Sequence, residues 1–198
     1  MDKLKIKADF TKYIEVFLQK NAKLNLISKN DEKLLFEKHI YDSLGIKLFF
    51  EKYNITAGDI LDIGCGGGFP CVPIAIEYPE FNVTGIDSIR KKINAINEIK
   101  EELTLTNLTT ICDRVENIKN KKFDVITSRA VADLSKICEY ALPLLKAGGY
   151  FAAYKSRKAQ EEIRNAIKVL AKIDEIITYT LPLDEVFERN LIIISKQP

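Results

Sequence analysis

Apolar residues in the first part of the chain recur at the spacing of a helix. One stripe follows the i, i+3, i+4, i+7, i+8 pattern of a single helical face, and it consists of Phe10, Tyr13, Ile14, Phe17 and Leu18. A second helix is expected to begin near Ser28 or Asn30, because either side chain can cap the first free backbone N–H groups. Its apolar positions continue through residues 34–40. We therefore expect residues 1–55 to form an N-terminal helical extension.

From Asp59 onward the pattern changes to short apolar runs that alternate with helical stripes. The runs predict seven strands, at residues 60–63, 82–86, 108–112, 123–127, 150–154, 176–180 and 191–195. The stripes predict helices near residues 72–76, 91–103, 134–145 and 158–171. Because strands and helices alternate with crossovers of this length, most of the sheet is expected to be parallel, with helices on both faces.

The end of the chain departs from this alternation. Only residues 181–189 separate the last two strands, so these are expected to be antiparallel neighbours. The predicted fold class is therefore α/β, with a mostly parallel seven-stranded sheet and an antiparallel C-terminal hairpin. Such a sheet resembles the Rossmann-like domain of class I methyltransferases. Residues 56–198 would form this domain, packed with residues 1–55 as one compact unit.

Composition and charge are those of an ordinary globular domain. Apolar residues make up 46% of the 198 residues and charged residues 29%. The net charge is only +2, so a basic footprint for nucleic acid has to be local. The start of the chain lacks the apolar core of an export signal, and no apolar run approaches the roughly 20 residues of a membrane span. We therefore expect a cytoplasmic protein without a membrane partner.

The cysteines do not suggest a metal site. They are Cys65, Cys71, Cys112 and Cys138, no two of them form a C-x-x-C pair, and His39 is the single histidine of the chain. A zinc site of the usual ligand spacing is therefore not expected. The cysteines are interpreted as reduced and mostly buried thiols.

The strongest chemical signal lies where the first predicted strand runs into glycines. This segment reads Asp62-Ile63-Gly64-Cys65-Gly66-Gly67-Gly68-Phe69-Pro70. In open α/β sheets the ligand crevice lies at the carboxyl ends of the strands, and glycines there let a ligand approach the backbone. The dinucleotide fingerprint fails because Phe69 stands at its third glycine, and there is no P-loop. The pattern D-x-G-x-G-x-G favours S-adenosylmethionine, with a ligand-free turn as the alternative.

Two further strand ends fit the same cofactor. Asp87 ends the second predicted strand, where a carboxylate can accept hydrogen bonds from both hydroxyls of a ribose. Its alternative role is to cap the helix that follows. Residues 113–116 follow the third strand, and in this fold that loop lies beside the adenine ring.

The segment after the fourth strand, Thr127-Ser128-Arg129-Ala130-Val131, usually carries the acceptor chemistry. It lacks the [N/D/S]-P-P-[Y/F/W] motif that is common in methylation of exocyclic amines. The Pro70-Cys71 pair lies in the cofactor loop and is interpreted as structural. An acceptor such as guanine N7 needs neither device, because its lone pair lies in the ring plane and no proton has to leave. The enzyme then contributes mainly proximity and alignment.

Several stretches together resemble the RsmG (GidB) family. They are Asn25-Leu26-Ile27-Ser28, Lys38-His39-Ile40-Tyr41-Asp42-Ser43-Leu44, residues 62–70, Ser128-Arg129-Ala130, Leu144-Leu145-Lys146-Ala147-Gly148-Gly149 and Tyr154-Lys155. The resemblance covers most of the chain. It implies methylation of guanine N7 in the 530 loop of bacterial 16S ribosomal RNA, with S-adenosylmethionine as cofactor. The implied partner is 16S RNA or the 30S subunit, and we expect a monomer without a metal.

The resemblance also implies roles for single residues. Gly64 and Phe69 correspond to its cofactor-loop contacts. Together with Gly66, Gly68 and Asp87 from the motif and strand-end arguments, and with Val115, Glu116 and Arg129, they make up the expected cofactor contacts. Val115 and Glu116 correspond to the pair that flanks the adenine, and Arg129 to the active-site arginine of the S-R-A motif. One departure is visible, because the family usually has glycine where this chain has Cys71.

His39, Asp42 and Ser43 are expected to join Arg129 in the catalytic site. Their i, i+3, i+4 spacing lets one helical face present all three side chains. The alternative is a hydrogen-bonded cluster that docks the N-terminal helices on the sheet. For Arg129, contact with the guanine edge or a phosphate competes with an ion pair to Asp62 or Asp87.

Two basic clusters follow strand ends on the cofactor edge. They consist of Arg90, Lys91 and Lys92, and of Lys155, Arg157 and Lys158. We interpret them as a track for RNA phosphates, with a solvated surface as the alternative. Two other functions stay open, a small-molecule methyltransferase and a non-catalytic, cofactor-binding protein that associates with RNA. A nicotinamide dehydrogenase ranks last because of Phe69.

Overall fold

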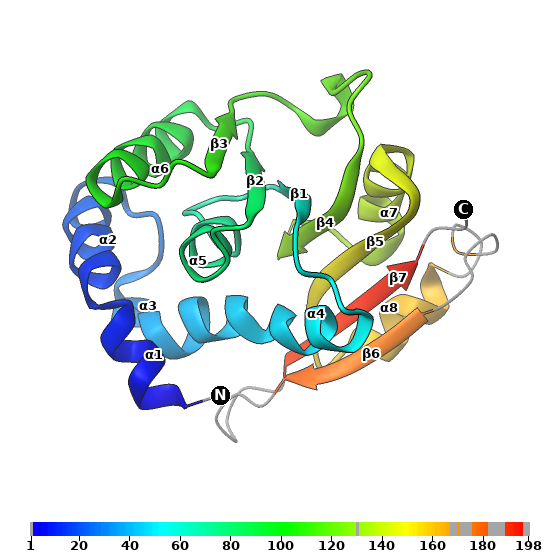
Figure 1. Ribbon diagram of the computed structural model, residues 1–198, viewed down its shortest axis with the longest axis horizontal. Coiled ribbons are helices and arrows are strands. Elements are labelled where there is room, and N and C mark those ends of the chain that lie inside the picture. Colours follow the sequence, from blue (N-terminus) through cyan, green and yellow to red (C-terminus); the bar gives the residue numbers. More distant parts are fainter. Residues whose placement is uncertain (1, 130, 167–169, 171–175, 182–188, 196–198) are drawn as a thin grey trace.

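A computed structural model describes residues 2–129, 131–166, 170, 176–181 and 189–195. These residues contain a seven-stranded sheet in the order β3-β2-β1-β4-β5-β7-β6. The strands are β1 (Gly58–Ile63), β2 (Phe81–Ile86), β3 (Leu108–Ile111), β4 (Phe123–Arg129), β5 (Leu145–Ser156), β6 (Ile176–Leu181) and β7 (Arg189–Ser195). Strands β1 to β5 are parallel to one another, whereas β7 is antiparallel to both β5 and β6. The predicted fold class and the C-terminal hairpin are confirmed (Figure 1).

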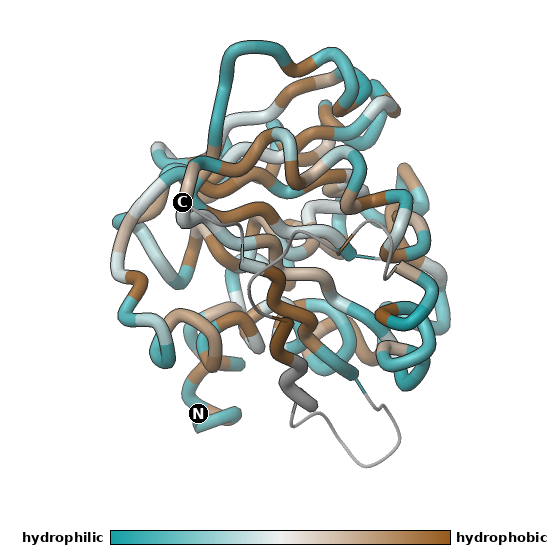
Figure 2. Tube along the Cα trace, turned by 90° about the vertical axis from the view of Figure 1, so that its right-hand side faces the viewer, coloured by the Kyte–Doolittle hydropathy of each residue, from teal (hydrophilic) through white to brown (hydrophobic). Residues whose placement is uncertain are grey.

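The central strands consist almost entirely of apolar residues because both faces of the sheet are covered by helices. Successive side chains of a strand point to opposite faces, so Ile60 belongs to one core and Leu61 to the other. Figure 2 shows the consequence, with hydrophobic strands through the middle of the molecule and hydrophilic segments outside. This arrangement leaves the strand ends as the places where polar groups can face a ligand.

Helices divide between the two faces of the sheet. On one face lie α5 (Cys71–Glu77) and α6 (Arg90–Leu103), and on the other α7 (Leu134–Leu144) and α8 (Ala159–Asn165). Each has an apolar side that packs against the strands. Among the residues described here, no helix is long and apolar enough to span a membrane.

The N-terminal helices share the core of α5 and α6. They are α1 (Lys3–Asp9), α2 (Thr11–Leu24), α3 (Lys29–Glu32), a π-helical turn η1 (Phe36–Tyr41), a 3₁₀ turn η2 (Leu44–Ile46) and α4 (Lys47–Tyr53). Ser28 caps α3 by accepting from the Asp31 N–H, as predicted, but the helix expected to continue through residue 40 is divided into α3 and η1. Phe17 and Phe49 are fully buried in the same cluster as Ile60. Figure 1 shows α2 beside α6. The domain boundary at residue 55 stays a prediction.

Two element boundaries differ from expectation. The glycines at 148 and 149 do not separate α7 from a strand at 150. Instead α7 ends at Leu144 and β5 begins at once, because Leu145 pairs with Phe123 of β4 before an irregularity in the register. Gly148 has a positive φ of 71°, which a glycine adopts without strain. The helix expected at 158–171 ends at Asn165, and residues 167–169 and 171 lie outside the described part of the chain.

Candidate active site

The carboxyl ends of β1, β2 and β3 border a cleft of about 260 Å³. Its lining residues are Ile63, Gly64, Ile86, Asp87, Ser88, Asp113, Arg114, Val115, Glu116, Val131, Ile137 and Tyr140. Apolar side chains form its walls, and carboxylates stand along it. The cleft therefore lies where ligands bind in an open α/β sheet, at the carboxyl ends of the strands.

The glycine loop is fastened to the end of β2. Gly64 and Cys65 both donate their N–H groups to the carbonyl of Ile86, at 2.8 and 3.0 Å. Gly66 donates to Asp87 Oδ2 at 3.0 Å, while Asp87 Oδ1 accepts from the Ile89 N–H at 2.9 Å. Gly64 and Gly66 have positive φ angles of 69° and 55°. These contacts hold the Asp87 carboxylate at the cleft.

Asp62 braces the loop from inside the protein. Its carboxylate is fully buried and accepts from the Cys71 N–H at 3.2 Å and from the Thr127 hydroxyl at 3.0 Å. Burial raises the pKa of Asp62 to about 7, although these hydrogen bonds act in the opposite direction. Asp62 thus connects β1, the start of α5 and β4, and no ion pair with Arg129 is described for it.

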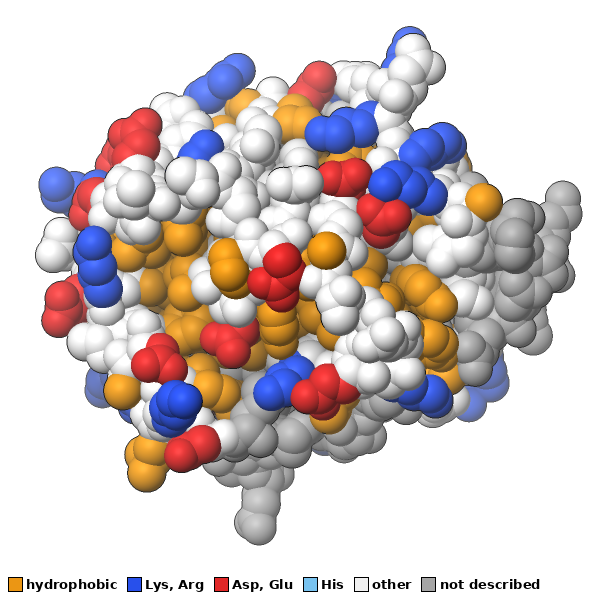
Figure 3. Space-filling view, viewed as in Figure 1, with side chains coloured by type: hydrophobic (Ala, Val, Ile, Leu, Met, Phe, Trp, Pro, Cys, Tyr) orange, Lys and Arg blue, Asp and Glu red, His pale blue; other side chains and the backbone are white. Residues whose placement is uncertain are grey.

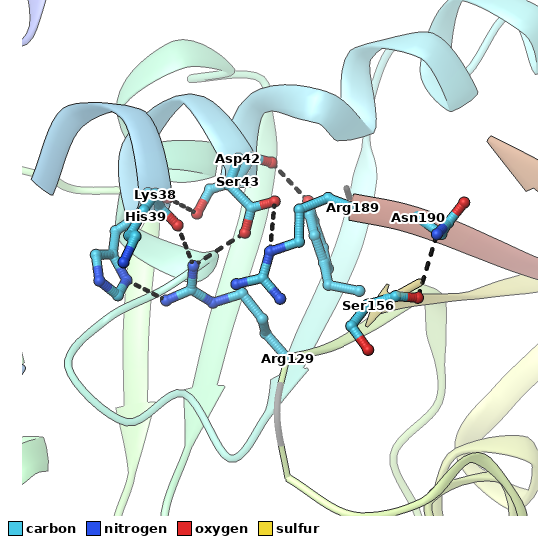
Figure 4. Close-up of polar contacts among 9 residues, drawn as sticks. Lys38, His39, Asp42, Ser43, Arg129, Ser156, Arg189 and Asn190 are labelled. Atoms are coloured by element: carbon cyan, nitrogen blue, oxygen red, sulfur yellow. Dashed lines mark hydrogen bonds and ion pairs between the residues drawn. The ribbon is translucent and has the colours of Figure 1, made fainter. Parts of the chain in front are cut away.

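Arg129 ends β4 and points toward the N-terminal helical segment (Figure 4). One terminal nitrogen donates to the Lys38 carbonyl and to Asp42 Oδ2, both at 3.1 Å, and the other lies 2.7 Å from His39 Nδ1. The guanidinium carbon stands 5.2 Å from the centre of the Phe69 ring, a cation–π distance. The partner of Arg129 is therefore Asp42, and neither Asp62 nor Asp87 takes that place.

The protonation state of His39 follows from this arrangement. Burial, and then the charge of Arg129, lower the pKa of His39 to about 3, so the ring is neutral at pH 7. Arginine can only donate, so Nδ1 accepts and the proton of the neutral ring is on Nε2. Within the described residues this buried Nε2 has no hydrogen-bond partner.

Ser43 has a different position from the other two predicted residues of the N-terminal segment. Its hydroxyl donates to the His39 carbonyl, and its own carbonyl accepts from the Tyr154 hydroxyl, both at 2.5 Å. The side chains of His39 and Asp42 therefore contact Arg129, whereas Ser43 joins the helix to β5. His39 belongs to the π-helical turn η1, a kind of local irregularity that recurs at functional sites.

A second arginine, which sequence reasoning missed, approaches the same carboxylate. Arg189 begins β7, and its Nε lies 3.7 Å from Asp42 Oδ1 (Figure 4). Asp42 is completely buried between the two guanidinium groups. Its desolvation raises the pKa of Asp42 even so, with both arginines acting in the opposite direction. The sequence offered only one indication of this contact, namely that Arg189 is a single basic residue shortly before the apolar run at 191–194.

Comparison with known proteins assigns the family. The family model described as rRNA small subunit methyltransferase G (GidB) matches residues 6–192. The chain belongs to this family. The protein of that name from Bacillus licheniformis is 40% identical over 95% of this chain and 81% of its own length. The one from Staphylococcus epidermidis is 38% identical over 96% and 82%. The predicted family is thereby confirmed.

A solved structure supports the fold. An S-adenosylmethionine-dependent methyltransferase from Clostridium acetobutylicum superimposes with a TM-score of 0.64, covering 85% of this chain and 99% of that one. At 15% sequence identity this likeness concerns the fold alone. The family and this fold make the chain a methyltransferase with S-adenosylmethionine as its cofactor.

The cleft fits the adenosine part of this cofactor. Asp87 keeps acceptor capacity on both carboxylate oxygens beyond its two backbone donors, which suits a pair of ribose hydroxyls. Ile86 and Val115 provide apolar walls against which an adenine ring can pack.

The predicted cofactor residues separate into two places. Gly64, Asp87, Val115 and Glu116 line the cleft, and Gly66 borders it through its bond to Asp87. Three others do not line it. Gly68 is buried against the side chain of Val72, the Phe69 ring contacts both His39 and Arg129, and Arg129 itself belongs to the cluster with His39 and Asp42. The sequence interpretation missed the wall formed by Val131, Ile137 and Tyr140.

The basic clusters are also split. Arg90 and Lys91 are exposed after β2 and Lys92 is half-buried, while Arg157 and Lys158 are exposed after β5. Lys155 departs from its predicted role, because its ammonium group is buried and bonds the Ala132 carbonyl at 2.6 Å and Glu162 at 2.7 Å. A phosphate therefore cannot reach it in this conformation. Figure 3 shows one face of the molecule, on which acidic and basic side chains are mixed.

Proposed function

We propose that this protein transfers the methyl group of S-adenosylmethionine to N7 of a guanine in the 530 loop of 16S ribosomal RNA. One observation carries the proposal. Beside the cofactor cleft, the polar side chains described around Arg129 include none that is free to remove a proton. His39 is neutral with its lone pair engaged, and Asp42 is held by two arginines. Guanine N7 suits such a site because it attacks with a lone pair and loses no proton.

The work of the protein is then binding and alignment. S-adenosylmethionine supplies an electrophilic methyl group on a sulfonium centre. Arg129 carries five N–H donors, and its contacts with Lys38, His39 and Asp42 use three of them. The remaining donors are suited to the O6 edge of a guanine. Because His39 and Asp42 fix the guanidinium in advance, little freedom is lost when the base binds.

Exposed basic side chains lie on both sides of the carboxyl ends of β1 and β4, where the methyl transfer would take place. Arg90 and Lys91 follow β2, and Arg157 and Lys158 follow β5. In the sheet order, β1 and β4 lie between those two strands, so the clusters bracket Gly64 and Arg129. This supports a phosphate track across the acceptor side, with 16S RNA or the 30S subunit as the substrate.

The deciding experiment uses 30S subunits and free 16S RNA from cells that lack the endogenous enzyme. The protein is incubated with S-adenosylmethionine labelled in its methyl group, and the label is mapped by chain cleavage at N7-methylguanine. We expect label at one guanine of the 530 loop. Absence of label from both RNA substrates, with cofactor binding intact, would contradict the proposal. It would favour a small-molecule methyltransferase or a non-catalytic RNA-associated protein.

Two variants separate the proposed roles. Asp87→Asn should weaken S-adenosylhomocysteine binding about tenfold to hundredfold, since hydrogen bonds to a charged group contribute roughly 1.5–3 kcal/mol. Arg129→Lys should leave that affinity within about twofold and lower kcat strongly, because lysine lacks the planar fork. Asp113→Asn is the matched control, since Asp113 also lines the cleft but already bonds Arg114 and Asn117.

A further inference from the structure

One side chain closes the cleft on the side of Arg129. A Cβ built on Gly64 would lie only 2.4 Å from Val131 Cγ2, so the valine covers the backbone of Gly64 directly. The other side of Val131 faces outward, and 45% of the residue is exposed. The cleft ends at Val131. Its volume of about 260 Å³ is slightly below the roughly 300–1,000 Å³ that is usual for ligand clefts.

The order of the strands shows what Val131 separates. Asp87 follows β2, Gly64 follows β1 and Arg129 ends β4, and these strands are neighbours in that order. Gly64 therefore lies on the side of the cleft that faces the Arg129 cluster. A ligand that extends from the cleft toward Arg129 has to pass over Gly64, where the Val131 side chain stands.

The segment that carries Val131 is held by an ion pair between buried Lys155 and half-buried Glu162. Lys155 of β5 donates to the Ala132 carbonyl at 2.6 Å and pairs with Glu162 of α8 at 2.7 Å. The same Glu162 oxygen accepts from the N–H of Leu134, the first residue of α7, at 3.0 Å. These contacts fasten both sides of the short stretch that follows Val131.

We propose that Val131 is a gate between the cofactor cleft and the acceptor site, and that Lys155 and Glu162 are positioning residues that hold it closed. The proposal rests on the proposed function, because it assumes a cofactor whose methyl-bearing arm extends toward Arg129. Binding of the whole cofactor displaces the valine from Gly64. Part of the binding free energy is spent on this displacement, which lowers the measured affinity.

The first test measures S-adenosylhomocysteine binding to the full chain by calorimetry, without RNA. Val131→Ala should lower the Kd by roughly threefold to tenfold, because a closed state that is mostly populated reduces affinity by that factor. Ile176→Ala is the matched control, since Ile176 is also an exposed apolar residue at a strand end, at 37%, but lies on the edge strand β6 away from the cleft, and should leave the Kd unchanged. A higher or unchanged Kd in Val131→Ala would overturn the gate.

The second test addresses the ion pair. Glu162→Gln keeps an acceptor for Leu134 but removes the charge that Lys155 faces, and should lower the Kd about twofold to fivefold. Glu161→Gln, an exposed neighbour on α8, is the control. In the Val131→Ala background, Glu162→Gln should change the Kd no further, since the gate is already open. A lower Tm with an unchanged Kd would show a merely structural pair and overturn the positioning role.

These readouts are independent of the RNA substrate. If the ribosomal assignment is wrong, the 30S subunits acquire no label, but the Val131 and Glu162 variants still change the Kd for S-adenosylhomocysteine. If the gate is wrong, methylation of 30S subunits persists while the Kd of the Val131 variant stays at or above that of the wild type.

Discussion

Arg129 and Asp42 form an ion pair of 3.1 Å that joins the end of β4 to the N-terminal helical segment, 87 positions earlier in the chain. Asp42 is fully buried and the Arg129 side chain is 11% exposed. The pair therefore has two consequences at once. It docks the helices on the sheet, and it fixes the guanidinium that would contact the base. For His39 and Asp42, a role in the active site and a role in docking the helices on the sheet are therefore compatible.

Removal of Asp42 should destabilise the whole protein. Asp42→Ala leaves Arg129 without its anionic partner in a nearly closed site, and breaking a buried pair costs about 3–5 kcal/mol. Urea unfolding measures the loss. The matched control is Glu139→Ala, whose pair with Lys136 is about half-exposed, so its loss should stay below about 1 kcal/mol. Equal losses in the two variants would contradict the structural role of Asp42.

The neutral state of His39 should make stability depend on pH. In the unfolded chain this histidine takes up a proton below pH 6.5, whereas in the folded protein burial and Arg129 hold its pKa near 3. Its contribution is therefore fully present above pH 6.5 and is lost as the pH falls toward 3, by up to about 1.4 kcal/mol per pH unit.

The variant His39→Gln isolates this effect from other titrating groups. The difference in unfolding free energy between wild type and variant should fall by roughly 1–2 kcal/mol from pH 7 to pH 5. Asp62 changes stability in the opposite direction, because its raised pKa of about 7 makes its contribution decline as the pH rises, but it is present in both proteins. A difference that does not vary with pH would show that His39 titrates normally.

The fold and the cofactor side could be predicted because both depend on local sequence. Apolar runs and helical stripes gave the element order, and chain order then determined which strand ends meet. Gly64 and Asp87 each follow a strand directly, and Val115 lies in the turn after β3, so their common cleft follows from the topology.

The acceptor side was harder because its contacts join distant parts of the chain. The pairing of Asp42 with Arg189 could not be inferred from either residue's neighbours. Lys155 lies in a basic run and looked like Lys158, yet one is buried against Glu162 and the other is exposed. Side-chain burial of this kind depends on tertiary packing, which local charge patterns do not report.

Gly64 should tolerate no side chain, for two separable reasons. Gly64→Ala places a Cβ on a backbone with a φ of 69° and 2.4 Å from Val131. Gly148→Ala is the matched control, because its φ is 71° but nothing lies within 4 Å of its Cβ position. Both variants should lose about 1–2 kcal/mol to the left-handed backbone. Only Gly64→Ala should also weaken S-adenosylhomocysteine binding, by at least about tenfold. Equal affinities in calorimetry would place the cofactor elsewhere.

The proposed phosphate track predicts a specific change in the salt dependence of RNA binding. Each lysine or arginine that neutralises a phosphate contributes roughly 0.7–0.9 to the slope of log K against log salt concentration. Single alanine variants of the exposed residues Arg90, Lys91, Arg157 and Lys158 should each lower the slope by about that amount, measured by filter binding of 16S RNA.

The control for this series is Lys119→Ala. Lys119 is exposed and carries the same charge, but it precedes β4 and so belongs to the opposite edge of the sheet. Its removal should leave the slope unchanged, although the net charge of the protein falls by the same amount. A uniform decrease in all five variants would mean that RNA responds to overall charge. A decrease restricted to Arg90 and Lys91 would confine the contact to the β2 side, because only there would charge removal release fewer counterions.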